Sequence, residues 1–113
     1  MTPVVFNYKD YIQDNTIHAT EFTVTKTING VTNPEDLTGA IIKCTFKHEE
    51  ETILKEIGSG ITVTDPSGGV VVIDEFKLVK AGNYVYDVKI IFPNGTNKTY
   101  IKGQVKILAA VTL

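Results

Sequence analysis

Ala81-Gly82-Asn83-Tyr84-Val85-Tyr86-Asp87 is the stretch of sequence that decides the fold of this chain. It joins a glycine-containing turn to the strongest alternating segment, in which every second residue is apolar: Tyr84, Tyr86, Val88, Ile90 and Phe92. Residues two apart on a strand face the same side of a sheet, so this face is predicted to be buried. A tyrosine at the start of such a strand is typical of a tyrosine corner, in which its hydroxyl bonds to upstream backbone. Gly82 and Tyr84 are therefore predicted to form a structural corner.

The composition favours sheet over helix throughout the chain. With 113 residues, 42% of them hydrophobic, the chain fits one domain over residues 1–113 that can bury a single core. Valine, isoleucine and threonine together make up 41 residues, against five alanines and five leucines. These β-branched side chains suit a pleated sheet and lose rotamer freedom in a helix. The chain is therefore predicted to be all-β.

Short alternating segments separated by turns recur along the sequence. The segments predicted as strands cover residues 17–28, 41–47, 52–57, 61–64, 70–73, 84–92 and 100–107. The turns between them contain residues that tolerate positive φ, as in Asn29-Gly30 and Asn94-Gly95. About seven to eight short antiparallel strands with a tyrosine corner predict an immunoglobulin-like β-sandwich.

The charges of the chain argue against nucleic-acid partners, and its apolar pattern argues against a membrane. The formal net charge is −2, with 11 lysines and no arginine. Non-specific nucleic-acid binding needs a basic excess, and specific recognition relies on the bidentate guanidinium group. No apolar run approaches the length of a membrane span, and Met1-Thr2-Pro3-Val4 lacks the basic start of a secretory leader. We expect a soluble protein that is not exported by an ordinary leader.

The chain offers few side chains for catalysis or metal binding. Its single cysteine, Cys44, lies on the apolar face of a strand and is predicted to be a buried small hydrophobe. His18 and His48 are the only histidines, and four residues of strand separate Cys44 from His48 by roughly 13 Å, too far for one metal ion. Ser59 and Ser67 lie in glycine-bearing turns without the spacing of a nucleophile elbow. We expect no metal, no cofactor and no enzymatic activity.

Both ends of the chain carry uncharged apolar segments. Their apolar residues are Val4, Val5 and Phe6 at one end and Leu108, Val111 and Leu113 at the other. In one interpretation these segments complete the sheets, because end strands are common in this architecture. In the other, residues 1–15 and 108–113 are docking arms that a partner chain covers by strand addition. The residues alone leave both interpretations open.

Several turn-and-strand motifs follow one another in a definite order between residues 16 and 107. They are Asp36-Leu37-Thr38-Gly39-Ala40 before the strand at 41–47, Ile61-Thr62-Val63-Thr64-Asp65, Gly68-Gly69-Val70, the corner stretch, and Lys102-Gly103-Gln104-Val105 in the last strand. This order resembles a family of small phage virion domains. It is similar to the N-terminal domain of phage baseplate upper proteins and to immunoglobulin-like domains of tail, fibre and head-decoration proteins.

The resemblance implies a non-enzymatic structural role in a bacteriophage virion, where the chain joins or decorates a larger assembly. It implies other virion proteins as partners in a multi-copy assembly, and it favours tail, baseplate or fibre over capsid decoration. No catalytic residue is carried over by it. Because virion proteins are made in the host cytoplasm and then assembled, the virion is the expected location.

A carbohydrate- or host-surface-binding adhesin module is the alternative function. Many sandwiches bind glycans through exposed aromatic rings, whose apolar faces stack on sugars and whose polar groups stay wet. The candidates are Tyr8, Tyr11 and Tyr100. Of these, Tyr100 is predicted to face outward, because it alternates with the apolar positions that begin at Ile101.

Overall fold

The computed structural model describes residues 4–49 and 51–111. The strands in this part of the chain are β1 (Val4–Val5), β2 (Tyr11–Ile12), β3 (Thr16–Ile17), β4 (Thr20–Thr23), β5 (Thr25–Ile28), β6 (Val31–Pro34), β7 (Ile41–His48), β8 (Glu51–Ile57), β9 (Gly60–Asp65), β10 (Val70–Ile73), β11 (Phe76–Lys77), β12 (Gly82–Ile91) and β13 (Asn97–Leu108). The described residues contain no helix, and therefore none long and apolar enough to cross a membrane. The chain is all-β, as predicted.

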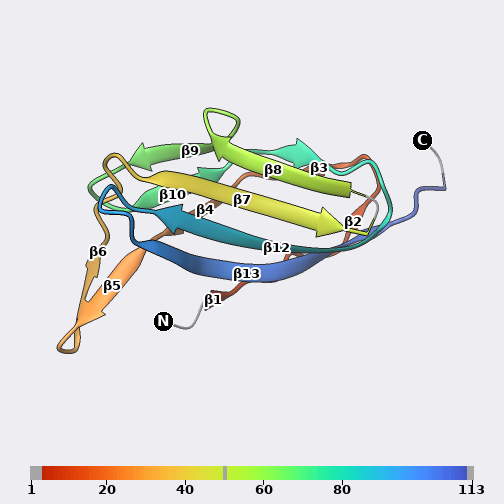
Figure 1. Ribbon diagram of the computed structural model, residues 1–113. Helices are drawn as coiled ribbons and strands as arrows, with labels where there is room; N and C mark the ends of the chain where they lie inside the picture. The colour runs from red at the N-terminus through yellow and green to blue at the C-terminus, as the bar shows by residue number, and fades with distance from the viewer. Residues whose placement is uncertain (1–3, 50, 112–113) are drawn as a thin grey trace.

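The strands form two layers packed face to face (Figure 1). One layer contains β8, β7, β12 and β13 side by side, and the layer behind it contains β9, β10 and β4. The hydrogen-bonded path runs β1-β13-β12-β7-β8-β9-β10-β4, and β2 also pairs with β13. This is the strand order of an immunoglobulin-like sandwich, with the last hairpin and the central strand in one layer and the earlier strands in the other. The predicted fold class is confirmed.

Most strand pairs are antiparallel, but three are parallel. The edge strands β1 and β2 both run parallel to β13, and β8 pairs with β9 in parallel over two residues. Gly58 lies between β8 and β9 and Gly60 begins β9, and their φ values of 84° and 99° are in the left-handed region. These glycines carry the chain from one layer into the other without reversing its direction. The purely antiparallel expectation is corrected in these three places.

The core forms where the inward faces of both layers meet. The inward residues of β12 are buried, as the alternation predicted: Tyr84, Tyr86, Val88 and Ile90. Phe46 of β7 lies at the centre of an aromatic cluster, with its ring centroid 5.0 Å from that of Tyr86 and 4.9 Å from that of Phe76. Offset and tilted ring pairs of this kind add to the free energy of burial, by about 1 kcal/mol each.

The turn at residues 36–40 packs against the core beside the start of β7. A carboxylate oxygen of Asp36 accepts hydrogen bonds from the backbone N–H and the hydroxyl of Thr38, at 2.9 and 2.6 Å. These bonds hold the pKa of Asp36 below its ordinary value. The turn points Leu37 into the core, where 3% of it is exposed, and Gly39 leaves the turn with φ of 74°. The motif therefore has a structural role in starting β7.

Candidate functional site

The predicted corner lies between β12 and the chain just before it. Tyr84 is fully buried, and its hydroxyl oxygen is 3.0 Å from the carbonyl oxygen of Lys80 and 3.2 Å from Oε2 of Glu51. Both partners are acceptors, so the single phenolic proton is shared between them. Gly82 has φ of 139°, and a Cβ added there would collide with the imidazole of His48. The geometry is that of a tyrosine corner.

The N-terminal segment is a strand at the edge of the sheet. The backbone N–H of Phe6 donates to the carbonyl oxygen of Lys102 at 2.9 Å, and the hydroxyl of Tyr86 donates to the carbonyl oxygen of Phe6. The side chains of Val4, Val5 and Phe6 are nevertheless 62%, 60% and 44% exposed. Residues 4–12 thus complete the sheet through their backbone, while the side chains of Val4, Val5 and Phe6 stay exposed.

Gly103 lets the N-terminal segment lie close to β13. A Cβ built on Gly103 would collide with the carbonyl oxygen of Phe6 and would approach the ring of Tyr86 to 2.9 Å. A side chain at this position would therefore push the N-terminal segment away from the sheet.

The C-terminal segment leaves the sandwich at its far end (Figure 1). Leu108 closes β13, and its carbonyl oxygen accepts a bond of 2.8 Å from the N–H of Gln13. The N–H of Ala110 donates to the side-chain oxygen of Gln13 at 3.2 Å. Beyond this contact Val111 is fully exposed, and Leu113 lies outside the described residues. An uncharged apolar segment therefore continues past the sheet.

An apolar groove runs along one side of the sandwich, between β4 and β1. Two adjoining hollows of about 160 and 190 Å³ form it, and Val4, Phe22 and Ile101 line both. On this side β4 ends the hydrogen-bonded path, because among the described residues it pairs only with β10. The groove therefore combines apolar side chains with an unpaired strand edge, which is the combination that accepts an added strand.

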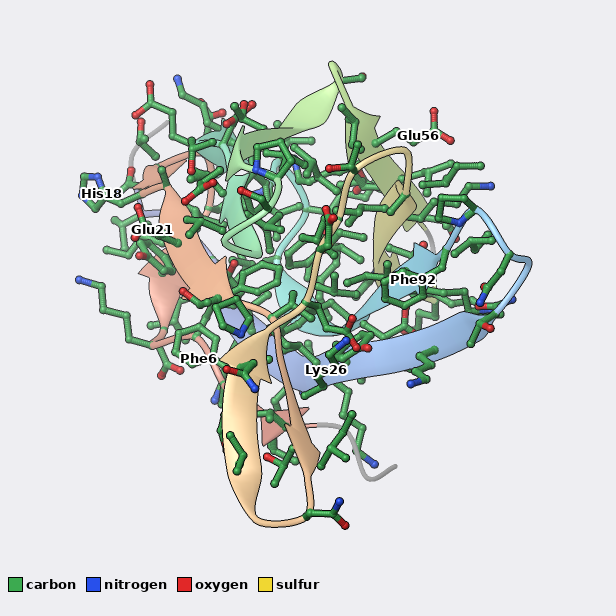
Figure 2. The ribbon with its side chains drawn as sticks, turned by 90° about the vertical axis from the view of Figure 1, so that its left-hand side faces the viewer. Phe6, His18, Glu21, Lys26, Glu56 and Phe92 are labelled. Atoms are coloured by element: carbon green, nitrogen blue, oxygen red, sulfur yellow. The ribbon has the colours of Figure 1, made fainter. Side chains whose placement is uncertain are left out.

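The backbone of β4 presents donors to this open side. The N–H of Val24, just after β4, donates to the carbonyl oxygen of Gly69 at 2.8 Å, on the side of β10. Successive N–H groups of a strand point to opposite edges. The N–H groups of Glu21 and Thr23 therefore point away from β10. Figure 2 shows Glu21 on the same flank of the molecule as Phe6, which lines the groove.

A second, wider hollow lies on the outer face of the sheet. It measures about 540 Å³ and crosses β7, β12 and β13. Its lining includes Asn7, Lys47, Asp87, Lys102 and Gln104. The one aromatic ring among the described residues that line it belongs to Tyr86, which is 4% exposed. This hollow offers hydrogen-bonding groups without a ring face on which a sugar could stack.

Tyr100 corrects the prediction of an outward ring. The ladder between β12 and β13 pairs Val88 with Ile101 but Lys89 with Thr99, so Tyr100 is an extra residue on β13. Such a bulge inverts the inward and outward alternation on its two sides. Tyr100 is consequently 4% exposed, with its hydroxyl 3.3 Å from a carboxylate oxygen of Glu35. It cannot serve as an exposed stacking face.

The hairpin of β5 and β6 projects from the body of the sandwich (Figures 1 and 2). All residues of Thr25–Ile28 and Val31–Pro34 are exposed, including Ile28 at 59% and Val31 at 58%. The turn residues Asn29 and Gly30 have φ of 51° and 78°, as a tight hairpin turn requires. The sequence prediction placed a turn here but no second strand.

The buried ionisable side chains Cys44 and Lys55 are packed among residues of the core. Cys44 is fully buried, as predicted, and burial raises the pKa of its thiol from 9.0 to about 12. Lys55 is 7% exposed, with Nζ 3.7 Å from the ring centroid of Phe76, and burial lowers its pKa. Within residues 4–49 and 51–111, no group of three or more His, Cys, Asp and Glu side chains could hold a metal ion.

Comparison with known proteins supports the fold and carries no function. No family model and no curated protein matches the chain. A crystal structure from Bacteroides vulgatus, whose name assigns it provisionally to the glycoside hydrolases, is 16% identical with a TM-score of 0.50. The match covers 90% of this chain but spans only 16% of that protein's length. Murine CRIg is 12% identical over 97% of this chain and 95% of its own, and its TM-score of 0.33 is too low to support the fold.

The groove is the candidate functional site that the sequence did not predict. Val4 and Phe6 were chosen from the sequence as possible docking residues, and both line it. Phe22 and Ile101 were assigned only to strands, yet they complete its lining. No local signal distinguishes them, because alternation shows which residues turn inward but not whether an opposite strand covers them.

Proposed function

We propose that this protein is a non-enzymatic structural module of a bacteriophage virion that joins or decorates a larger assembly. The observation that carries this is the open side of the sandwich, where an apolar groove lies beside the unpaired edge of β4. Edges and grooves of this kind are stabilised when another chain covers them. The ordered motifs resemble phage virion domains, and for this reason we propose that the assembly is a virion. The same resemblance favours the tail, baseplate or fibre over the capsid.

Repetition strengthens such an attachment. Exposed apolar side chains lie on the N-terminal edge strand, on the projecting hairpin and on the C-terminal segment, as Val5, Ile28 and Val111 illustrate. Each surface is small, and burying one apolar side chain contributes only about 1.5–3 kcal/mol. In a multi-copy particle, modest contacts add up because each further contact forms between chains already held together.

Labelling of purified particles tests this proposal. An affinity tag after Leu113 is detected by gold-conjugated binder on virions that are imaged by negative-stain electron microscopy. We expect label at one repeated position, most often on the tail or its tip. Particles that carry no label and contain no peptide of this chain by mass spectrometry, while the infected-cell extract contains both, would contradict a virion role.

The adhesin hypothesis has less support from the candidate rings. Tyr100 is buried, and Tyr8 and Tyr11 are only partly exposed. The hydrogen-bonding groups of the outer-face hollow remain as a possible site for a sugar. A glycan array with the purified protein and with Asp87→Ala decides the matter: binding that the substitution abolishes would favour the adhesin function over the structural one.

A further inference from the structure

No strand among the described residues pairs with the outer edge of β4. In immunoglobulin-like folds the first strand commonly pairs with the second within the same layer. Here the N-terminal strands β1 and β2 pair with β13 in the other layer, and within the described residues nothing pairs with the outer edge of β4. The outward N–H groups of Glu21 and Thr23 and the apolar groove below them are therefore uncovered.

The C-terminal segment of the chain has the properties of the missing strand. Residues 108–113 carry no charged side chain, and Leu108 and Val111 are 39% and 104% exposed. The segment follows directly on the last residue of β13, and it leads away from its own sandwich (Figure 1). In an extended strand Ala109, Val111 and Leu113 share one face, so one face is wholly apolar.

The donor segment is long enough to cover the acceptor edge. β4 contains 4 residues, which at a rise of about 3.3 Å per residue present an edge of roughly 13 Å. Residues 109–113 span roughly 16 Å when extended. The aliphatic side chains of this segment would face Phe22 and Val4, which line the groove. The projecting hairpin is a poorer donor, because β5 and β6 already use one edge each to pair with one another.

We propose that the segment that follows Leu108 in one copy adds as a strand to the edge of β4 in a second copy and covers its apolar groove. The two surfaces involved are different, so the contact is head-to-tail. Repeated contacts of this type build an open chain or, where the rotation closes, a ring. The inference goes beyond the virion role, because it concerns self-association and holds wherever the protein is located.

Two substitutions separate the two sides of the contact. Val111→Asp places a charge on the donor face, and because Val111 is fully exposed the isolated fold is not disturbed. Glu21→Pro removes an outward N–H from β4, which an edge strand tolerates without losing its bonds to β10. Each substitution has a matched control. Val111→Ile keeps the apolar face of the donor segment, and Glu21→Ala keeps the outward N–H group of β4.

Sedimentation velocity of the full chain over a range of concentrations measures the association. We expect wild type and both controls to form oligomers that grow with concentration. Val111→Asp and Glu21→Pro are expected to weaken association at least tenfold, while circular dichroism and melting temperature stay those of the wild-type fold. If Glu21→Pro lowers the melting temperature, Val111→Asp alone decides the test.

Mixing the two variants gives the sharpest result. The Val111→Asp protein keeps an intact β4 edge, and the Glu21→Pro protein keeps an intact donor segment. A head-to-tail contact therefore predicts that the mixture forms a one-to-one dimer and nothing larger. A wild-type protein that stays monomeric at every concentration, or a Val111→Asp protein that associates as wild type does, overturns the proposal. Neither outcome depends on where the protein lies in a particle, so particle labelling remains a separate test.

Discussion

The hydroxyl of Tyr84 lies 3.0 Å from the carbonyl oxygen of Lys80, four residues upstream in the chain. This contact joins the start of β12 to the segment that leads into it, and the phenol ring of Tyr84 is completely buried. A buried hydroxyl that loses its partner, or a carbonyl group that loses its donor, costs free energy that water no longer compensates. Tyr84 therefore holds the connection that enters β12 in two ways, because its ring is buried in the core and its hydroxyl bonds to the backbone of that connection.

Tyr84→Phe is expected to lower the free energy of unfolding by about 1 kcal/mol, because it removes the shared hydrogen bond and keeps the ring. Urea denaturation followed by circular dichroism measures the change. Tyr11→Phe is the matched control: Tyr11 is partly exposed, and its hydroxyl makes no hydrogen bond within the described residues. Equal stability of Tyr84→Phe and wild type would show that the corner contributes nothing.

Gly103→Ala is expected to detach the N-terminal segment from β13. The added methyl group collides with the carbonyl oxygen of Phe6, and overpacking of this kind costs about 1–3 kcal/mol. Hydrogen exchange of the Phe6 and Tyr8 amides, which donate to Lys102 and Gln104, is expected to accelerate while exchange in β12 changes little. Lys102→Ala, at an exposed neighbouring position, is the control. Unchanged protection of both amides in Gly103→Ala would contradict the close approach.

Stability is expected to fall as the pH rises above about 9, in part because of Cys44. The folded protein holds the pKa of this thiol at about 12 against 9.0 for an exposed thiol, so between these values the folded state binds the extra proton. Stability from this group is complete below pH 9.0 and decreases as the pH approaches 12, by up to about 1.4 kcal/mol per pH unit.

Cys44→Ala isolates that contribution. Urea denaturation at about pH 8 and about pH 10 gives the change in the free energy of unfolding with pH for wild type and for the variant. The variant is expected to lose less stability over this interval. Tyr8, whose pKa burial raises from 10.0 to about 12, adds its loss mainly above pH 10, outside the interval between the two measurements. Identical slopes would mean that the thiol ionises alike in both states.

The projecting hairpin is expected to be independent of the core. Replacing Ile28 and Val31 together by threonine should change the free energy of unfolding by no more than about 0.5 kcal/mol, because both side chains are more than half exposed. Differential scanning calorimetry measures this, with Val71→Thr at a fully buried position as the destabilised reference. A loss in the double variant that matches the reference would show that the hairpin packs on the sandwich.

Local periodicity was sufficient to predict the central strands. Tyr84, Tyr86 and Val88 turned inward because side chains two apart must share a face, and no tertiary contact can change that within an unbroken strand. The turn at Asn94-Gly95 was predicted for the same local reason, since the φ of 88° at Gly95 suits glycine. Tyr100 was predicted wrongly because a single extra residue in the β13 ladder inverts the alternation, and the sequence carries no mark of that bulge.

The sequence by itself determined the all-β class, the position of the corner tyrosine, the buried cysteine and the uncharged apolar ends. Each of these depends on neighbours along the chain, through side-chain period, backbone preference or lack of charge. Only the tertiary structure decided that the N-terminal segment pairs with β13 rather than with β4. That choice depends on which distant strands meet, and it leaves the edge of β4 and the groove lined by Phe22 open for another chain.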